Sequence, residues 1–126
     1  MQFLHSMIRV KDEIESKRFY CEILGLKEDR RIQLNDCCLQ YLCDENTGFE
    51  IELTINDEIP KQGYTNGSSF GHFAFSCDNL DEIDKKIKQF GYKWDVEPFY
   101  MKEVNTRIAF LLDPDGNSVE LIENSN

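Results

Sequence analysis

The chain contains only two histidines, and each is followed by a glutamate at almost the same distance. Glu52 follows His5 by 47 positions (52 − 5), and Glu120 follows His72 by 48 positions (120 − 72). Two imidazoles and two carboxylates that converge form an N2O2 donor set, which suits an octahedral divalent transition ion and leaves room for water. The spacing therefore predicts one metal centre with four protein ligands, which are His5, Glu52, His72 and Glu120.

Each of these residues has a simpler alternative when it is taken singly. A histidine in a strand is commonly a hydrogen-bonded core or edge residue, and a glutamate in a strand commonly faces solvent. Recurrence favours the metal centre, because His5 and His72 lie 67 positions apart (72 − 5), and Glu52 and Glu120 lie 68 apart (120 − 52).

These residues belong to a longer internal repeat. The segment LGLKED near residue 25 is similar to FGYKWD near residue 91, and Gly25 and Gly91 lie 66 positions apart (91 − 25). Each glycine ends a segment with helical periodicity, which begins at Asp12 in the first half and at Asn79 in the second. In this alignment the expected core positions of the first helix are Ile14, Cys21 and Leu24, equivalent to Leu80, Ile87 and Phe90 in the second.

Apolar segments around each helix predict that each half folds as β-α-β-β-β. The predicted strands cover residues 2–10, 26–33, 37–43 and 48–55 in the first half and 70–77, 92–95, 106–112 and 117–123 in the second. The sequence DPDGN forms a tight turn between the last two. The predicted fold class is α+β, a single domain over residues 1–126 with two modules, 1–55 and 70–126, and a linker over 56–69.

Alternation along the last strand of each half places the acids on one face. Glu52 is expected on the face of its strand opposite to that of Ile51. Glu120 is expected on the face opposite to that of Val119 and Leu121. We expect Glu50 and Glu123, on the neighbouring positions, to face solvent.

Composition and charge limit the partners. A length of 126 residues with 40% apolar content suits one globular core. The net charge of −10 disfavours nucleic acid and anionic membranes, and no apolar run approaches the roughly 18 residues of a membrane span. With no secretory signal pattern at the start, we expect a cytoplasmic protein that binds a small molecule.

Five cysteines without a CxxC motif indicate neither a disulfide framework nor a zinc-thiolate site. Reduced thiols packed in strands are the favoured interpretation. Redox activity at the adjacent Cys37 and Cys38 is the alternative.

Five segments together are similar to one known family. They are LHSMIRVKD at 4–12, FYCEILGLK at 19–27, IELTIN at 51–56, GHFAFSCDNLDE at 71–82 and IAFLLDPDGNSVELIE at 108–123. The chain resembles glyoxalase I, or lactoylglutathione lyase, in the vicinal oxygen chelate superfamily. The resemblance implies mixed curved sheets that form a metal-centred barrel across a homodimer. The family's four metal-ligand positions fall on His5, Glu52, His72 and Glu120.

The resemblance also implies how the sites are shared and which metal they hold. In the family the facing halves belong to different chains, so His5 and Glu52 are expected to meet His72 and Glu120 of the partner subunit. The short chain is similar to bacterial members activated by Ni²⁺ or Co²⁺. Zn²⁺ is the alternative, because nitrogen and oxygen sites select metals more by geometry and availability than by affinity.

Three further residues match substrate-binding positions of the family. Arg9 and Asn56 fall on positions that hold the γ-glutamyl end of glutathione, and Lys102 loosely matches a basic residue near the glycyl carboxylate. The alternatives are a surface ion-pair partner for Arg9, a turn residue for Asn56 and a solvated lysine for Lys102.

The implied reaction is a step in methylglyoxal detoxification, in which the hemithioacetal of methylglyoxal and a thiol is isomerised to an S-lactoyl thioester. The divalent ion lowers the cost of an enediolate. Glu120 is the expected main base, which takes the proton from the carbon between oxygen and sulfur and returns it to the adjacent carbon. Glu52 lies opposite Glu120 in this scheme.

One departure from the family leaves the thiol open. The family commonly continues the Glu52 strand as ELTxNWG, whereas this chain reads ELTINDEIP, with Asp57 and Glu58 in place of Trp and Gly. Two added carboxylates disfavour an anionic thiol such as glutathione. The alternatives on the same scaffold are an acyl-coenzyme A epimerase, a thiol transferase, which needs only three protein ligands, and a non-catalytic binding module, which lacks the metal ligands.

Overall fold

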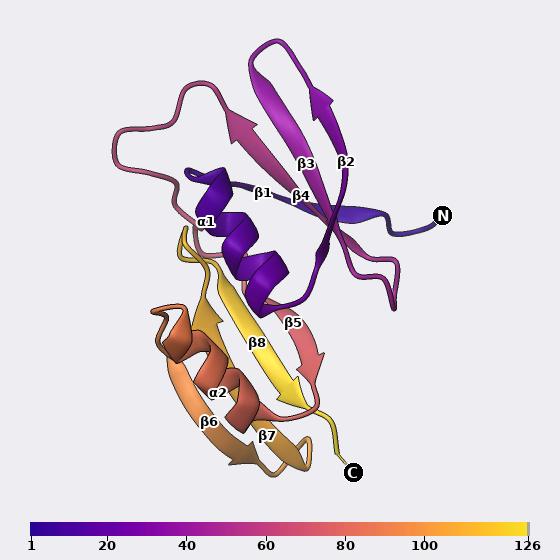
Figure 1. Ribbon diagram of the computed structural model, residues 1–126, viewed down its shortest axis with the longest axis vertical. Coiled ribbons are helices and arrows are strands. Elements are labelled where there is room, and N and C mark those ends of the chain that lie inside the picture. Colours follow the sequence, from indigo (N-terminus) through magenta and orange to yellow (C-terminus); the bar gives the residue numbers. More distant parts are fainter. Residues whose placement is uncertain (126) are drawn as a thin grey trace. The chain divides into compact units, whose positions relative to one another are not determined.

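The computed structural model describes residues 1–125 and divides the chain into two compact units (Figure 1). The first unit runs from Met1 to Thr65, and the second begins at Asn66. Each unit contains one four-stranded sheet and one helical segment, in the order β-α-β-β-β. The predicted α+β architecture of two βαβββ halves is confirmed. The single domain over residues 1–126, with its linker, stays a prediction.

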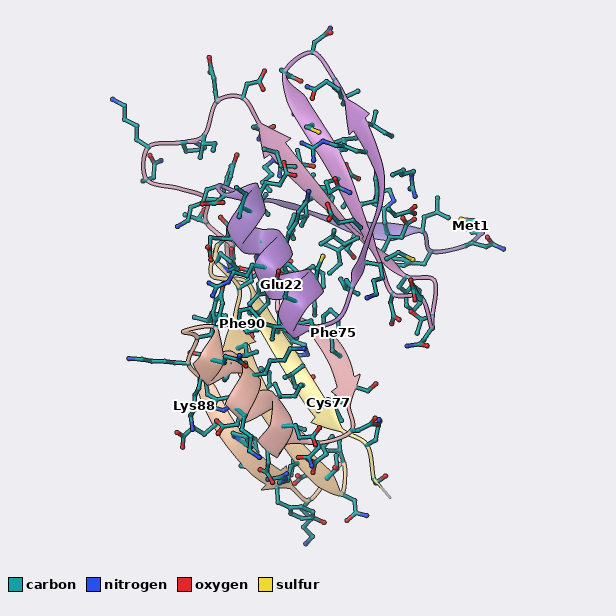
Figure 2. All side chains as sticks on the ribbon, in the orientation of Figure 1. Met1, Glu22, Phe75, Cys77, Lys88 and Phe90 are labelled. Carbon is teal, nitrogen blue, oxygen red and sulfur yellow. The ribbon has the colours of Figure 1, made fainter. Side chains whose placement is uncertain are left out.

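The elements of the first unit are β1 (His5–Arg9), α1 (Glu13–Lys17), a π-helix (Arg18–Ile23), β2 (Lys27–Gln33), β3 (Cys37–Cys43) and β4 (Glu50–Asn56). Those of the second unit are β5 (His72–Cys77), α2 (Leu80–Gln89), β6 (Val96–Met101), β7 (Thr106–Leu112) and β8 (Ser118–Glu123). Figure 2 shows Met1 at the start of the segment that precedes β1. No helix within residues 1–125 is long and apolar enough to cross a membrane.

The two sheets have the same strand order and the same register. The order is β1-β4-β3-β2 in the first unit and β5-β8-β7-β6 in the second. In each sheet the strand that comes first in the chain pairs in parallel with the one that comes last, that is, β1 with β4 and β5 with β8. The other pairs are antiparallel. Met7 pairs with Glu52, and Ala74 pairs with Glu120. The sequence repeat is therefore a structural repeat.

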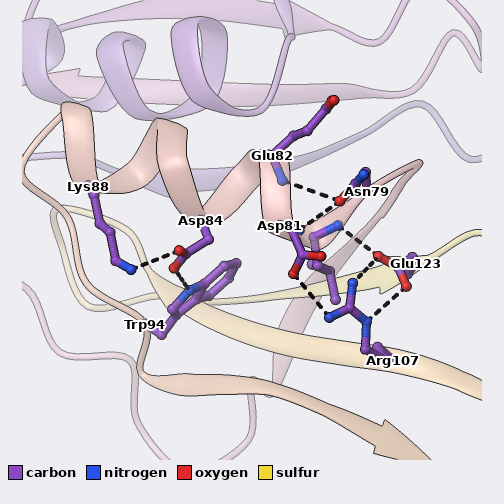
Figure 3. Close-up of polar contacts among 9 residues, drawn as sticks. Asn79, Asp81, Glu82, Asp84, Lys88, Trp94, Arg107 and Glu123 are labelled. Atoms are coloured by element: carbon purple, nitrogen blue, oxygen red, sulfur yellow. Dashed lines mark hydrogen bonds and ion pairs between the residues drawn. The ribbon is translucent and has the colours of Figure 1, made fainter.

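Both helices begin and end at the residues that the sequence predicts. The Asp12 side chain accepts a hydrogen bond from the backbone N–H three residues on, at 3.1 Å. Asn79 accepts two such bonds, at 2.9 and 3.3 Å (Figure 3). Gly25 and Gly91 follow the helices with φ of +85° and +81°, a conformation that glycine adopts without strain.

The two helical segments differ in length by one residue. From the capping residue to the glycine, the first spans 13 positions (25 − 12) and the second spans 12 (91 − 79). The π-helix absorbs the extra residue, because its wider turn joins residues five positions apart. The backbone N–H of Leu24 donates to the carbonyl of Phe19 at 3.2 Å.

This extra residue makes the predicted core of the first helix wrong. Ile14 is 78% exposed, and Cys21 and Leu24 are only half-buried. The repeat offset is 67 before the π-helix and 66 after it, so a single offset assigns the wrong face. The buried face of the helical segment is instead formed by Ser16, Phe19, Tyr20 and Ile23. In the second helix Leu80 and Ile87 are fully buried, as predicted.

Most strands agree with the sequence, but one does not. The predicted strands over 37–43 and 106–112 match β3 and β7 in full. The prediction over 92–95 is wrong, since β6 begins at Val96. Trp94 is engaged by α2 instead, and its indole N–H donates to Asp84 at 2.8 Å (Figure 3). Pro98 lies within β6, which accommodates it as an irregular edge strand.

The prediction that Glu50 and Glu123 face solvent is also wrong. Glu123 accepts hydrogen bonds from the Arg107 guanidinium at 2.8 and 3.0 Å and from the backbone N–H of Leu80 at 2.8 Å (Figure 3). The hydrogen bonds from Arg107 are the largest influence on the pKa of Glu123, and with the hydrogen bond from the Leu80 N–H they hold it below its usual value. Glu50 pairs with Arg30 at 2.7 Å. Both acids therefore have structural partners.

Candidate metal centre

The first His–Glu pair lies on the adjacent strands β1 and β4. His5 Nε2 is 2.8 Å from Glu52 Oε2. The two side chains share a face because Glu52 pairs with Met7, which lies two residues after His5. The opposite face carries the fully buried Leu53 and belongs to the core.

The second pair repeats this arrangement on β5 and β8. His72 Nε2 is 3.0 Å from Glu120 Oε2, and Glu120 pairs with Ala74, two residues after His72. The second pair is the more open one. The side chains of His72 and Glu120 are 42% and 16% exposed, against 31% and 10% for the first pair.

An aromatic ring from the third strand of each sheet adjoins each pair. Tyr41 and Phe110 each pair with the glutamate of their own sheet. The ring centroids of His5 and Tyr41 are 5.4 Å apart, and those of His72 and Phe110 are 5.8 Å apart, both edge to face. We did not predict either ring from the sequence. The available signal is their equivalent spacing, 11 and 10 positions before the glutamate (52 − 41 and 120 − 110).

The Tyr41 hydroxyl distinguishes the first pair from the second. The side chain is buried, and this burial raises the pKa of Tyr41. The charge of Glu52 and a hydrogen bond to its carboxylate raise it further. The Arg30 guanidinium, 3.7 Å from the Tyr41 ring centroid, acts in the opposite direction without reversing the shift. The hydroxyl therefore remains a protonated donor at neutral pH.

The donor atoms of each pair suit an octahedral ion. Adjacent ligands of such an ion, bonded at about 2.1 Å, lie about 3.0 Å apart. The two N···O distances of 2.8 and 3.0 Å are close to this separation. In the first pair Nε2 of His5 is the nitrogen turned toward the carboxylate, and Nδ1 is buried without a hydrogen-bond partner among residues 1–125.

Each unit contributes two donors. Within residues 1–125 no three His, Cys, Asp or Glu side chains gather closely enough to hold a metal ion. Each pair is therefore half of the predicted donor set.

The predicted substrate residues fall in both units. Arg9 is the exposed last residue of β1 and pairs with Thr54. Asn56 is the last residue of β4, and its side-chain amide donates to the Tyr64 hydroxyl at 3.0 Å. The structure thus places Arg9 and Asn56 at the same end of the first sheet. Lys102 lies exposed in the turn after β6, in the second unit.

The cysteines have the properties of structural thiols. Cys37 and Cys38 are buried in β3, and no disulfide involves a cysteine of the described chain. Burial raises the pKa of Cys21, Cys37, Cys43 and Cys77. A raised pKa lowers the thiolate fraction and hence the reactivity. This favours the structural interpretation over redox activity.

The chain is similar to known proteins along nearly its whole length. The sequence model of the Glyoxalase/Bleomycin resistance protein/Dioxygenase superfamily matches residues 2–121. The chain is 38% identical over 130 residues to a probable lactoylglutathione lyase of Synechocystis sp., which covers 100% of this chain and 98% of that protein. It is also 38% identical over 128 residues to a lactoylglutathione lyase of Escherichia coli O157:H7, which covers 98% of this chain and 93% of that protein.

A solved structure gives the same result for the fold. The crystal structure of glyoxalase I from Zea mays has a TM-score of 0.86 to this chain. The match has 36% identity and covers 99% of this chain. The chain spans 45% of the maize chain.

Proposed function

This chain belongs to the Glyoxalase/Bleomycin resistance protein/Dioxygenase superfamily, and we propose that it is a lactoylglutathione lyase, that is, a glyoxalase I. The reaction isomerises the hemithioacetal of methylglyoxal and a thiol to an S-lactoyl thioester. The observation that carries the proposal is the matched pair of His–Glu contacts, 2.8 and 3.0 Å long, at the same register in both units. A cytoplasmic location, where reduced thiols persist, is part of the same proposal.

The proposed cofactor is one divalent ion per site. The resemblance of this short chain to bacterial family members activated by Ni²⁺ or Co²⁺ favours one of these ions. Zn²⁺ is the alternative, because nitrogen and oxygen sites select metals more by geometry and availability than by affinity. The proposed ligands are His5, Glu52, His72 and Glu120. When bound, the ion supplies a Lewis acid that stabilises negative charge developing on the substrate oxygens.

Glu120 is the proposed main base. Its carboxylate takes the proton from the substrate carbon between oxygen and sulfur, and then delivers it to the adjacent carbon. The hydroxyl proton moves between the two oxygens, so atoms and electrons balance without an oxidant or a reductant. The greater exposure of the second pair supports this role, because the base must reach the substrate. Glu52 lies opposite and completes the donor set.

The proposed assembly is a homodimer with two shared sites. Each unit carries only two of the four donors, so a complete site needs two units that face one another. In the proposed dimer, His5 and Glu52 face His72 and Glu120 of the partner subunit. Closed two-fold symmetry then generates two equal sites.

The proposed thiol is recognised mainly by the first unit. Arg9 offers a bidentate donor for a carboxylate, and Asn56 lies at the same sheet end. Lys102 is the proposed contact for the opposite end of the thiol. Asp57 and Glu58 follow Asn56 directly, and their carboxylates repel negative charge on the substrate. A thiol compound with less negative charge than glutathione is therefore a specific alternative.

The function is tested by reconstitution of the purified, metal-stripped protein. Methylglyoxal is supplied with glutathione, bacillithiol or coenzyme A after addition of Ni²⁺, Co²⁺ or Zn²⁺, and thioester formation is measured. We expect activity with Ni²⁺ or Co²⁺ and none without metal. Stoichiometric metal binding without thioester from any thiol would point to another enzyme on the same scaffold. No metal binding at all would contradict the proposal.

A further inference from the structure

The two glutamates occupy equivalent positions, but their neighbours differ in hydrogen-bonding capacity. The residue aligned with the acid on the adjacent strand is Tyr41 in the first unit and Phe110 in the second. Two residues after the acid, on the same face, the first unit has Thr54 and the second has Ile122. At both positions the first unit has a hydroxyl where the second is apolar.

Both hydroxyls of the first unit reach the Glu52 carboxylate. Tyr41 hydrogen-bonds to it, and Thr54 Oγ1 lies 3.5 Å from Glu52 Oε1. Together with His5 Nε2 at 2.8 Å, three groups surround one carboxylate that is 10% exposed. A carboxylate held from several sides has few orientations open to it.

The Tyr41 ring is itself held in place. The His5 ring meets it edge to face at 5.4 Å, and the Arg30 guanidinium lies 3.7 Å from its centroid. Arg30 is fixed in turn by Glu50, at 2.7 Å. The hydroxyl is therefore presented to Glu52 from a rigid support.

Glu120 has a different environment. Among residues 1–125 its one recorded polar partner is His72, at 3.0 Å. Phe110 and Ile122 offer no hydrogen bond. Its carboxylate is free to turn about its side-chain bonds without losing a partner other than the histidine.

We propose that Tyr41 is a positioning residue, supported by Thr54, that fixes Glu52 as a constant metal ligand and leaves Glu120 as the acid that moves the proton. This inference rests on the proposed function, because it assigns different duties to two acids of the same metal centre. Two residue differences, Tyr41 against Phe110 and Thr54 against Ile122, make the two equivalent carboxylates unequal. Hydrogen-bond partners of metal ligands commonly set metal affinity and ligand orientation.

The first test measures metal affinity, without any reaction. Apoprotein of the wild type, Tyr41→Phe and Phe110→Tyr is titrated with Co²⁺ against a chromophoric chelator, and the visible Co²⁺ spectrum is recorded. Tyr41→Phe should weaken binding by about 10-fold or more, and Thr54→Val should weaken it less. Phe110→Tyr should not weaken it. Affinity and spectrum unchanged in Tyr41→Phe would overturn the proposal, whether or not the wild type is an isomerase.

The second test uses the sign of an effect. At saturating metal, Tyr41→Phe should lower kcat severalfold in the wild-type background, because the fixed ligand is loosened. In the Glu120→Gln background the same change should raise the residual kcat, because the released Glu52 takes over proton transfer. A fall in both backgrounds would show a merely structural effect and would overturn the proposal. Thermal unfolding of each apoprotein, and recovery of the same signs with Thr54→Val, establish that misfolding does not produce the result.

Discussion

The two units share their topology and the register of the His–Glu pair, yet they differ in what surrounds the acid. In the first unit Glu52 is the more buried acid and is held by two hydroxyls. In the second unit Glu120 is flanked by Phe110 and Ile122. The donors are thus constant between the halves, whereas the groups that restrain them differ. Two copies of one fold can therefore keep the same ligand positions and surround them with different hydrogen-bonding groups.

The helices are also attached to their sheets differently. Glu13 of α1 binds Arg31 of the edge strand β2 at 2.6 and 2.9 Å. In the second unit Arg107, on the inner strand β7, bridges Asp81 of α2 and Glu123 of β8 (Figure 3). The strand that carries Glu120 is therefore tied directly to its helix through Arg107.

The largest predicted effect separates the two acids. Glu120→Gln should lower kcat by more than about a hundredfold, because the amide cannot accept the substrate proton. Glu52→Gln should act mainly on metal affinity. Both variants are assayed at measured full metal occupancy. Equal losses of kcat under that condition would remove the division of roles between the units.

A second prediction concerns the charge that Arg9, in the first unit, offers to the substrate. Arg9→Met should raise KM for the glutathione hemithioacetal by about tenfold, with a smaller change in kcat, because a charge-assisted contact is lost. The equivalent position in the second unit is Ser76 (76 − 9 = 67), and Ser76→Ala is the matched control. Steady-state kinetics on both variants measure the contrast. An unchanged KM in Arg9→Met would place substrate recognition elsewhere.

The third prediction compares the two helix attachments by stability. Arg107→Met should destabilise the second unit by about 1–2 kcal/mol, because Glu123 loses its charged partner while one-third exposure of the guanidinium limits the cost. Arg31→Met should cost about 0.5 kcal/mol or less at its more exposed site. Urea unfolding is followed by circular dichroism for both variants, and by the fluorescence of Trp94, the only tryptophan, for the second unit. A larger loss from Arg31→Met would reverse the comparison.

The smallest predicted effect depends on pH. Hydrogen bonding to Arg31 is the largest influence on Glu13, and with Lys17 it outweighs desolvation and lowers the pKa of Glu13 to about 2. Its stabilising contribution is therefore fully present above about pH 4.5 and is lost as the pH falls toward 2. The urea midpoint of the wild type, followed by circular dichroism, should fall across this range more steeply than that of Arg31→Met. Parallel curves would show that this pair contributes nothing.

The sequence predicts most of the fold because its repeat contains both periodic apolar positions and the residues that begin and end helices. Asp12, Asn79 and the two glycines mark the helix ends, and predominantly apolar segments define β3 and β7 in full. The buried face of the first helix was predicted wrongly because one extra residue is absorbed by a π-helix, which no local propensity indicates. The β6 prediction failed for two reasons. Trp94 is held by a side chain from α2, and Pro98, which argues against a strand, is tolerated here because β6 is an edge strand.

The candidate site was less predictable than the fold. The matched spacing paired each histidine with one glutamate, and in the structure the members of each pair lie 2.8 and 3.0 Å apart. The role of Tyr41 was not visible, because cross-strand alignment with Glu52 depends on the register of β3 against β4. Glu50 and Glu123 were assigned to solvent because arginine partners from another strand cannot be inferred from alternation alone.

The central claim, that each site takes one His–Glu pair from each of two chains, is tested most directly by complementation. His5→Ala and His72→Ala should each be nearly inactive, because every site in either homodimer has lost a ligand. When the two are co-refolded with random pairing, half of the dimers are mixed, and each mixed dimer has one intact site and one with both lesions. Activity should return to about a quarter of the wild-type value. No recovery despite demonstrated subunit exchange would contradict the shared site.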